Sequence, residues 1–240
     1  MILSHKHKFI FICNGKTGTT SIEKQLMKYQ EGAEYEVTVP GLYVGRHIPA
    51  AALRPQLPPE IWDGYFKFGF VRNPYDWFVS VYFWNMLPGP WTKSWKFAVK
   101  SPLKWVRARQ QERATAPSGP NGTLAVADID RCRERILRFR ALEGAPDLLQ
   151  VAHLNAPDDA PLMDKVGKFE NLEADFDEIC QRIGIPTPKL EKNNATKHKS
   201  YTDYYTPASR AHVRQVWARD FAAFGYDPNA AWDRARGRRS

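Results

Sequence analysis

The chain has 240 residues, of which 43% are hydrophobic, 13% aromatic and 25% charged. This composition is typical of a globular protein and excludes a wholly disordered or fibrous chain. The 35 Lys and Arg residues exceed the 26 Asp and Glu residues and give a formal net charge of +9. Such an excess predicts an anionic partner, and leaves open whether that partner is nucleic acid, a membrane surface or a small anion.

Cysteines and apolar segments bear on where the protein works. The three cysteines are widely spaced and form no C-x-x-C pair, so neither a disulfide framework nor a zinc ribbon is expected. The apolar run Phe9–Cys13 is much shorter than the roughly 20 residues that cross a bilayer. It is also shorter than the hydrophobic region of a secretory signal. We therefore expect a cytoplasmic protein with reduced thiols and no transmembrane segment.

The first part of the chain predicts a strand, a loop and a helix. Residues 8–13 are a short apolar run typical of a buried strand, and Asn14–Gly18 is a loop. Hydrophobic residues at helical spacing then predict a helix from Thr19 to about Gln30. Glycines and prolines make residues 31–60 largely irregular, with a short helix around Ala50–Leu53.

The same order of elements follows a second time. The aromatic run Tyr65–Val71 predicts another core strand, and a helix from about Tyr75 to Asn85 follows Pro74. In an open α/β sheet, ligands bind at the carboxyl ends of the strands, where both loops lie. The predicted class is thus α/β: a P-loop-like, mostly parallel sheet flanked by helices in a single domain.

The remaining chain predicts three helices and one strand. These are the helices Asp130–Leu142, Leu172–Ile183 and Pro207–Phe224, and a strand within Leu162–Phe169. We expect one domain over residues 1–240, with a basic, Trp-rich insertion at about 87–125 and a basic tail at 234–240.

The segment Phe11–Ser21 has the features of an anion cradle. A strand leads into a turn that is rich in glycine and threonine, and a helix begins directly after it. Glycines let backbone N–H groups point inward, and the helix N-terminus adds partial positive charge. The Walker A pattern needs a glycine six residues before the lysine of this loop, and Ile10 occupies that position. An ATP-type P-loop is therefore disfavoured, whereas another phosphate-like group is not.

A second segment, Phe70–Tyr82, also suits anion binding. Arg72 ends a strand, where a planar guanidinium can bind a phosphate through two hydrogen bonds. Ser80 lies two helical turns after Asn73 on roughly the same face, so its hydroxyl could reach the same anion. Alone, Arg72 could equally form a surface salt bridge.

Together the two segments resemble the sulfotransferases that use 3′-phosphoadenosine 5′-phosphosulfate (PAPS), of the carbohydrate and bacterial types. The shared patterns are Lys-Thr-Gly-Thr-Thr-Ser after the first strand and Arg-Asn-Pro-x(5)-Ser-x-Tyr after a later one. The resemblance continues through Val166–Leu172, Tyr201–Thr206 and Asp220–Tyr226, and lapses over roughly residues 87–160. It implies a sulfuryl transfer that needs no metal, with PAPS as the donor and adenosine 3′,5′-bisphosphate (PAP) as a product.

The resemblance also implies residue roles. Lys16 would stabilise charge on the departing phosphate oxygen. The 5′-phosphate would be held by the loop residues Thr17, Gly18, Thr19, Thr20 and Ser21. Arg72 and Ser80 would bind the 3′-phosphate, and Lys197 or Lys199 could add charge from a late loop, unless they are simply solvated lysines.

Sulfuryl transfer also needs a group that takes the proton of the acceptor hydroxyl. His47 is the candidate base, because several carbohydrate-type relatives place a histidine in a similar region and the unperturbed pKa of histidine is about 6.5. A loop histidine that packs on Pro49 is the plain alternative. Some relatives use a glutamate instead, for which Glu23 and Glu36 are outside candidates.

Residues 91–113 carry seven basic residues and one acidic residue among three tryptophans. This segment could bind the acceptor, a carbohydrate or another small molecule, or could be an amphipathic helix with a solvated basic face. Two rival functions stay open: a P-loop kinase-like phosphotransferase, and a non-enzymatic binder of nucleic acid or another polyanion. The sequence does not indicate the oligomeric state.

Overall fold

The computed structural model describes residues 1–31, 47–86, 116–142, 148–190 and 199–232. The chain divides into two compact units. The first contains residues 1–73, 137–197 and 219–226, and the second contains residues 74–136, 198–218 and 227–240. Most of the predicted insertion and the whole predicted tail lie outside the described residues, so these two predictions stay predictions.

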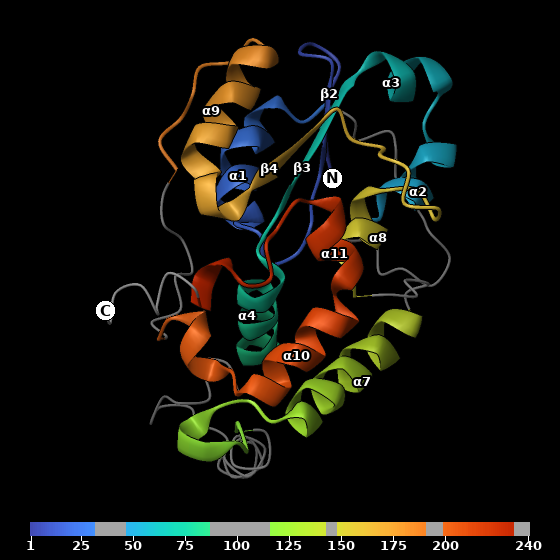
Figure 1. The fold of residues 1–240 in the computed structure, drawn as a ribbon. Coiled ribbons are helices and arrows are strands. Elements are labelled where there is room, and N and C mark those ends of the chain that lie inside the picture. The colour runs from blue at the N-terminus through green and yellow to red at the C-terminus, as the bar shows by residue number, and fades with distance from the viewer. Residues whose placement is uncertain (32–46, 87–115, 143–147, 191–198, 233–240) are drawn as a thin grey trace, which may run out of the picture. The chain divides into compact units, whose positions relative to one another are not determined.

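A four-stranded sheet forms the centre of the first unit, in the order β1–β2–β3–β4 (Figure 1). The strands are β1 (Ile2–Ser4), β2 (Phe9–Ile12), β3 (Phe66–Val71) and β4 (Lys165–Lys168). β1 pairs with β2 in the antiparallel sense, while β2, β3 and β4 run parallel to one another. The register places Phe11 opposite Phe68, and Phe70 opposite Gly167. The three parallel strands therefore end at one common edge.

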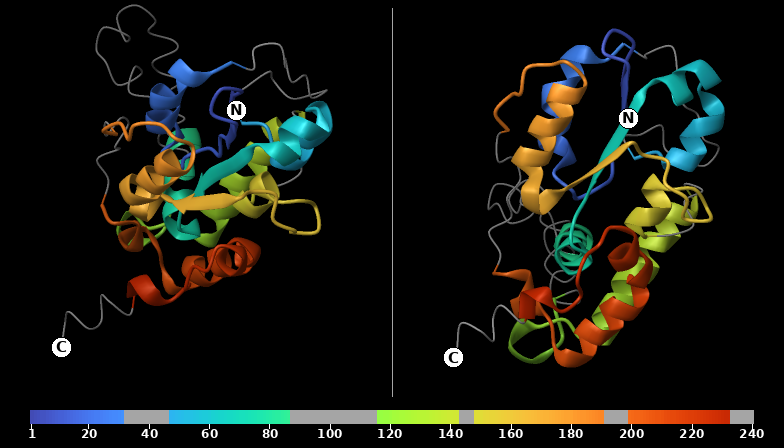
Figure 2. Two further views of the ribbon diagram at one scale, coloured as in Figure 1. Left: turned by 90° about the horizontal axis from the view of Figure 1, so that it is seen from above. Right: turned by 45° about the horizontal axis from the view of Figure 1, so that its top comes forward.

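Helices cover both faces of this sheet (Figure 2). On one face, α1 (Thr19–Leu26) and α9 (Leu172–Arg182) bury residues such as Ile22, Phe176 and Ile179 against strand phenylalanines. The other face is covered by α2 (Ala50–Leu53), α3 (Pro59–Gly64) and α8 (Gln150–Leu154). Because both faces are covered, the strands are apolar on both sides, as parallel strands usually are. The predicted α/β class with a mostly parallel sheet is confirmed.

The outer edge of β1 is closed by the segment that follows α1. After the short 3₁₀ turn Met27–Tyr29, the side chain of Gln30 accepts a hydrogen bond from Leu3 N at 3.1 Å. Glu31 N donates to Leu3 O at 2.9 Å. The Glu31 carboxylate also accepts from Ser4 Oγ and from Lys6 N. Both main-chain groups of Leu3 are thus bonded within the chain.

The second unit is helical in its described part. It contains α4 (Pro74–Met86), most of α7 (Val126–Leu142) and α10 (Pro207–Val216). Short 3₁₀ turns form at Pro120–Gly122 and Tyr201–Tyr204. Its core is aromatic, with Phe78 and Trp217 rings 5.1 Å apart. α10 begins with a capping box in which Thr206 and Ser209 bond each other's backbone N–H groups.

Most predicted elements are present, with small shifts at their ends. The predicted strands correspond to β2, β3 and β4, and the short helix predicted at Ala50–Leu53 is α2. The last predicted helix is divided, because Trp217 leaves the helical conformation between α10 and α11 (Ala218–Ala223). The prediction omitted β1, α3 and α8. No helix among the described residues is long and apolar enough to cross a membrane.

Candidate functional site

A tight loop connects the carboxyl end of β2 to α1. Two of its residues adopt positive φ angles, Lys16 at 66° and Gly18 at 80°. Gly18 precedes the first residue of α1, and its carbonyl accepts a hydrogen bond from Ser21 N at 3.1 Å. A Cβ atom on Gly18 would lie 2.9 Å from Leu172 Cδ2, so any other residue here would have to displace the Leu172 side chain as well as adopt a positive φ. The loop therefore brings the first N–H groups of α1 up to the edge of the sheet.

Side chains of the loop form hydrogen bonds within it and to the sheet. The Thr17 hydroxyl donates to Asn14 O at 2.7 Å, and Asn14 Nδ2 donates to Phe70 O of β3 at 3.0 Å. Thr19 and Ser21 are buried and Thr20 is half-buried. The hydroxyl proton of Thr17 is thus used inside the loop, and an anion would meet the backbone N–H groups first.

Lys16 carries the charge of this loop. Burial, together with the positive charge of Arg72, lowers the pKa of the Lys16 ammonium from 10.5 to about 8. Both causes disfavour the protonated form, and a bound anion would favour it. The site thus concentrates positive charge that an anion would stabilise.

Arg72 follows the last residue of β3 and is buried. Its Nη1 lies 3.4 Å from Lys16 O, although the two residues are 56 positions apart in the sequence. The guanidinium stacks over the Phe169 ring, with Cζ 4.2 Å from the ring centroid. The ends of β2, β3 and β4 therefore meet at Arg72, as predicted for the carboxyl edge of a parallel sheet.

His47 lies beside the same loop and is exposed. Its Nδ1 is 2.9 Å from Cys13 O. Because a carbonyl oxygen only accepts, the ring donates through Nδ1–H, and in the neutral ring the lone pair is on Nε2. A Cβ atom on Gly15 would lie 3.8 Å from His47 Cε1. The structure thus brings His47 next to the loop that carries Lys16.

The outside candidates for the base differ in their surroundings. Glu23 is buried on α1, where it accepts a hydrogen bond from Cys13 Sγ at 3.2 Å. Burial, followed by the charge of Glu23, raises the pKa of the Cys13 thiol to about 12. Glu23 therefore faces a protonated thiol under the loop, whereas Glu36 lies outside the described residues.

The structure does not test three predicted binding residues. Ser80 is buried on α4, and Lys199 is exposed; both belong to the second unit. Lys197 lies outside the described residues. Their roles in binding stay predictions.

Five residues at this edge of the sheet were not predicted for the site. Gln150 and Phe169 contact Arg72 itself. Glu170 accepts hydrogen bonds from Asn73 N at 2.7 Å and from Tyr226 OH at 2.8 Å. His153 is buried, and its Nε2 donates to Cys13 O at 3.1 Å. Phe169, Glu170 and Tyr226 lie in segments that carry the family resemblance, and this resemblance could have indicated them as site residues. Gln150 and His153 lie in no motif, so no sequence pattern indicated their positions.

The group as a whole is a cationic cradle beside the exposed imidazole of His47. Backbone N–H groups, a lysine and an arginine are donors suited to phosphate or sulfate oxygens. The histidine can accept a proton from a neutral nucleophile. The arrangement suits the transfer of an anionic group to a hydroxyl.

Comparisons with known proteins agree with this chemistry. A family model described as "Sulfotransferase family" matches residues 1–227. The chain is similar to "Carbohydrate sulfotransferase 10" of Xenopus laevis, with 24% identity over 242 residues, which cover 94% of this chain and 67% of the relative. No solved structure matches the chain.

Proposed function

The chain belongs to the sulfotransferase family, and on that premise we propose that it transfers a sulfuryl group from PAPS to a hydroxyl group of a carbohydrate or another small acceptor. One observation carries the proposal: the loop after β2 and the end of β3 bring Lys16 and Arg72 together, with Nη1 of Arg72 3.4 Å from Lys16 O. Two cations at one sheet edge suit a donor with phosphate at both ends.

The donor would lie along this edge. The loop from Thr17 to Ser21 would bind the 5′-phosphate through the N–H groups at the start of α1. Arg72 would bind the 3′-phosphate, with Ser80 as its predicted partner. Lys197 or Lys199 would add charge from the late loop.

The chemical step exchanges one S–O bond for another. The acceptor oxygen forms a bond to sulfur while the bond from sulfur to the phosphate oxygen breaks, which leaves PAP and the sulfated acceptor. The Lys16 ammonium would stabilise the negative charge on the leaving oxygen. His47 would take the acceptor's proton on Nε2, in the orientation that its Nδ1–H bond to Cys13 O sets.

The acceptor class and the location are part of the proposal. The similarity to a carbohydrate sulfotransferase supports a sugar hydroxyl as the acceptor. We propose a cytoplasmic location from the cysteine pattern and from the lack of an apolar segment long enough to cross a bilayer.

Thermal shift with nucleotides tests the donor site. A ligand at 100 times its Kd adds about 2.7 kcal/mol to the free energy of unfolding, so we expect PAP to raise Tm by several degrees without added metal. A larger shift with ATP and Mg²⁺ would favour a kinase-like enzyme. A shift only with polyanions such as heparin would favour a non-enzymatic binder.

Transfer of labelled sulfate from PAPS to a panel of sugars and phenols tests the reaction itself. We expect His47→Ala to lower turnover by a factor of roughly 10²–10⁴, the usual contribution of a general base, while the Tm shift with PAP is kept. Full turnover by this variant at every pH would place the base elsewhere.

A further inference from the structure

The helix α8 approaches the carboxyl ends of β2 and β3 with two polar side chains. Gln150 and His153 are three positions apart on this helix, so they lie on the same face. Both are buried, at 1% and 3% exposed. A buried amide needs hydrogen-bond partners, and those of Gln150 define its role.

Gln150 continues the hydrogen bonding of the sheet beyond the last residue of β3. Arg72 N donates to Gln150 Oε1 at 2.9 Å, and Gln150 Nε2 donates to Arg72 O at 2.8 Å. The amide thus binds both main-chain groups of Arg72, as a neighbouring strand would. Its Oε1 also accepts from Asn14 Nδ2 at 3.4 Å, which links the anion loop to the same point.

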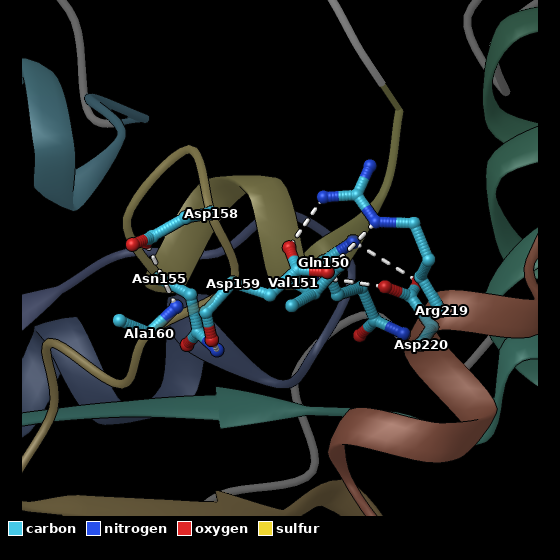
Figure 3. Close-up of polar contacts among 8 residues, drawn as sticks. All are labelled: Gln150, Val151, Asn155, Asp158, Asp159, Ala160, Arg219 and Asp220. Atoms are coloured by element: carbon cyan, nitrogen blue, oxygen red, sulfur yellow. Dashed lines mark hydrogen bonds and ion pairs between the residues drawn. The ribbon is translucent and has the colours of Figure 1, made fainter.

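Two residues of α11 hold α8 in place (Figure 3). The fully buried Asp220, on α11, accepts from Gln150 N at 3.0 Å and from Val151 N at 2.9 Å. A carboxylate at these first N–H groups stabilises the helix N-terminus. The preceding residue, Arg219, pairs with Asp159 in the loop after α8. Adjacent residues of α11 therefore fix both the start of α8 and the loop after it.

We propose that Gln150 is a positioning residue that makes the enzyme selective for a 3′-phosphate, because it sets the backbone from which the Arg72 guanidinium reaches its anion. The inference rests on the proposed function, in which Arg72 binds that phosphate. The guanidinium itself contacts the Phe169 ring and Lys16 O, and neither of these contacts holds the main chain of Arg72.

The test compares PAP with adenosine 5′-monophosphate (AMP), which lacks the 3′-phosphate, by calorimetric binding. In the unaltered protein, PAP should bind more tightly than AMP, and Arg72→Ala should remove most of this preference. Gln150→Met keeps the length of the side chain but loses its hydrogen bonds. We expect it to weaken PAP binding roughly tenfold, because small misplacements of a binding group are costly, and to change AMP binding less than twofold.

Asn155→Leu is the matched control. Asn155 is also a buried amide, directly after α8, and its Nδ2 donates to Asp159 O at 2.9 Å instead of to Arg72 (Figure 3). This variant should keep the preference for PAP. If Gln150→Met weakens PAP and AMP equally, or if Asn155→Leu loses the preference as well, Gln150 has only a structural role and the inference is wrong.

Two further outcomes are distinguishable. If Gln150→Met does not fold, Asp220→Asn provides the test, because it weakens the hydrogen bonds that hold the start of α8. This variant should also lower the ratio of PAP affinity to AMP affinity. An unchanged ratio would reject the inference. If the unaltered protein itself binds PAP no better than AMP, the proposed donor site is wrong and the inference falls with it.

Discussion

At the scale of single residues, Lys16 links backbone geometry to charge. A lysine with φ at 66° is in a region that costs roughly 1 kcal/mol or more for a residue with a Cβ atom. Its ammonium is also partly removed from water and lies near the charge of Arg72. The positive φ strains the backbone, and the loss of water disfavours the charged ammonium. A bound anion would stabilise that charge.

The pH dependence of nucleotide binding follows from the lowered pKa of Lys16. A phosphate beside the ammonium raises its pKa above the value of about 8 in the free protein, so the complex binds more protons than the free protein above pH 8. PAP affinity should therefore fall by up to about tenfold per pH unit above pH 8. Calorimetry at pH 7, 8 and 9 measures this, and Lys16→Met should bind weakly with no such dependence.

Lys16→Arg is the control, because arginine stays protonated throughout this range. Its PAP affinity should be nearly constant from pH 7 to pH 9. A slope as steep as that of the unaltered protein would assign the titration to another group.

The stability of the free protein changes with pH in the opposite direction to PAP affinity. Between about pH 8 and 10.5, Lys16 is protonated in the unfolded chain but has lost its proton in the folded one. The free energy of unfolding should therefore rise with pH over this range.

Sequence patterns predicted the neighbourhood of Lys16 and Arg72, because each follows a recognisable strand, whereas His47 was indicated by the family resemblance alone. They could not predict Gln150. Its partner Arg72 is 78 positions away, and a lone glutamine has no pattern that distinguishes a buried hydrogen-bonding role from a surface position. Such a role becomes visible only when α8 is placed against the end of β3.

At the scale of elements, the junction between β2 and α1 depends on the positive φ of Gly18 and on the close approach of α9. Gly18→Ala should lower the free energy of unfolding by about 2–3 kcal/mol, because it combines backbone strain with a contact of 2.9 Å to Leu172. Urea unfolding measures this difference, and PAP binding should weaken in the folded fraction.

Gly184 supplies the matched comparison at the end of α9. It has φ at 68°, and a Cβ atom there would meet nothing within 4 Å. Gly184→Ala should therefore show the conformational cost alone, about 1 kcal/mol. Equal losses in the two variants would mean that crowding at Gly18 has no energetic weight.

The elements that the sequence did not predict were missed for two physical reasons. β1 and α8 have three and five residues, too few for a periodic pattern to emerge. α3 begins at Pro59, and prolines in this stretch favoured irregular structure, although proline is well tolerated in a first helical turn. The longer elements, with their alternating or helical patterns, were predicted to within a few residues.

At the scale of the whole molecule, the net charge of +9 is only partly explained by the donor site. Lys16 and Arg72 account for two positive charges, and much of the remaining excess is in residues 91–113 of the sequence. We predict that this segment attracts an anionic or sugar acceptor. Replacing Lys96, Lys100 and Lys104 by alanine should raise the acceptor KM several-fold and leave PAP affinity unchanged.

A variant of equal charge separates this effect from a general one. Alanine at the exposed positions Lys6, Lys28 and Lys189 removes the same three charges elsewhere on the chain. Its acceptor KM should stay within about twofold of the unaltered value. If both triple variants raise KM alike, net charge alone attracts the acceptor, and the segment has no specific role.

The closed edge of β1 has a consequence for self-association. An edge strand with open main-chain groups is a template on which a strand of another molecule can add, and repeated addition leads to aggregates. Since Gln30 and Glu31 bond both main-chain groups of Leu3, the sheet cannot extend there. Hydrogen bonds from Lys6 N and Ser4 lower the pKa of the Glu31 carboxyl. These two hydrogen bonds therefore stabilise the folded protein at neutral pH, and their contribution is lost as the pH falls through the lowered pKa. Acid should therefore loosen the attachment of Glu31 to Ser4 and Lys6, whereas the two hydrogen bonds that cover Leu3 do not titrate and should keep this edge closed to a second molecule.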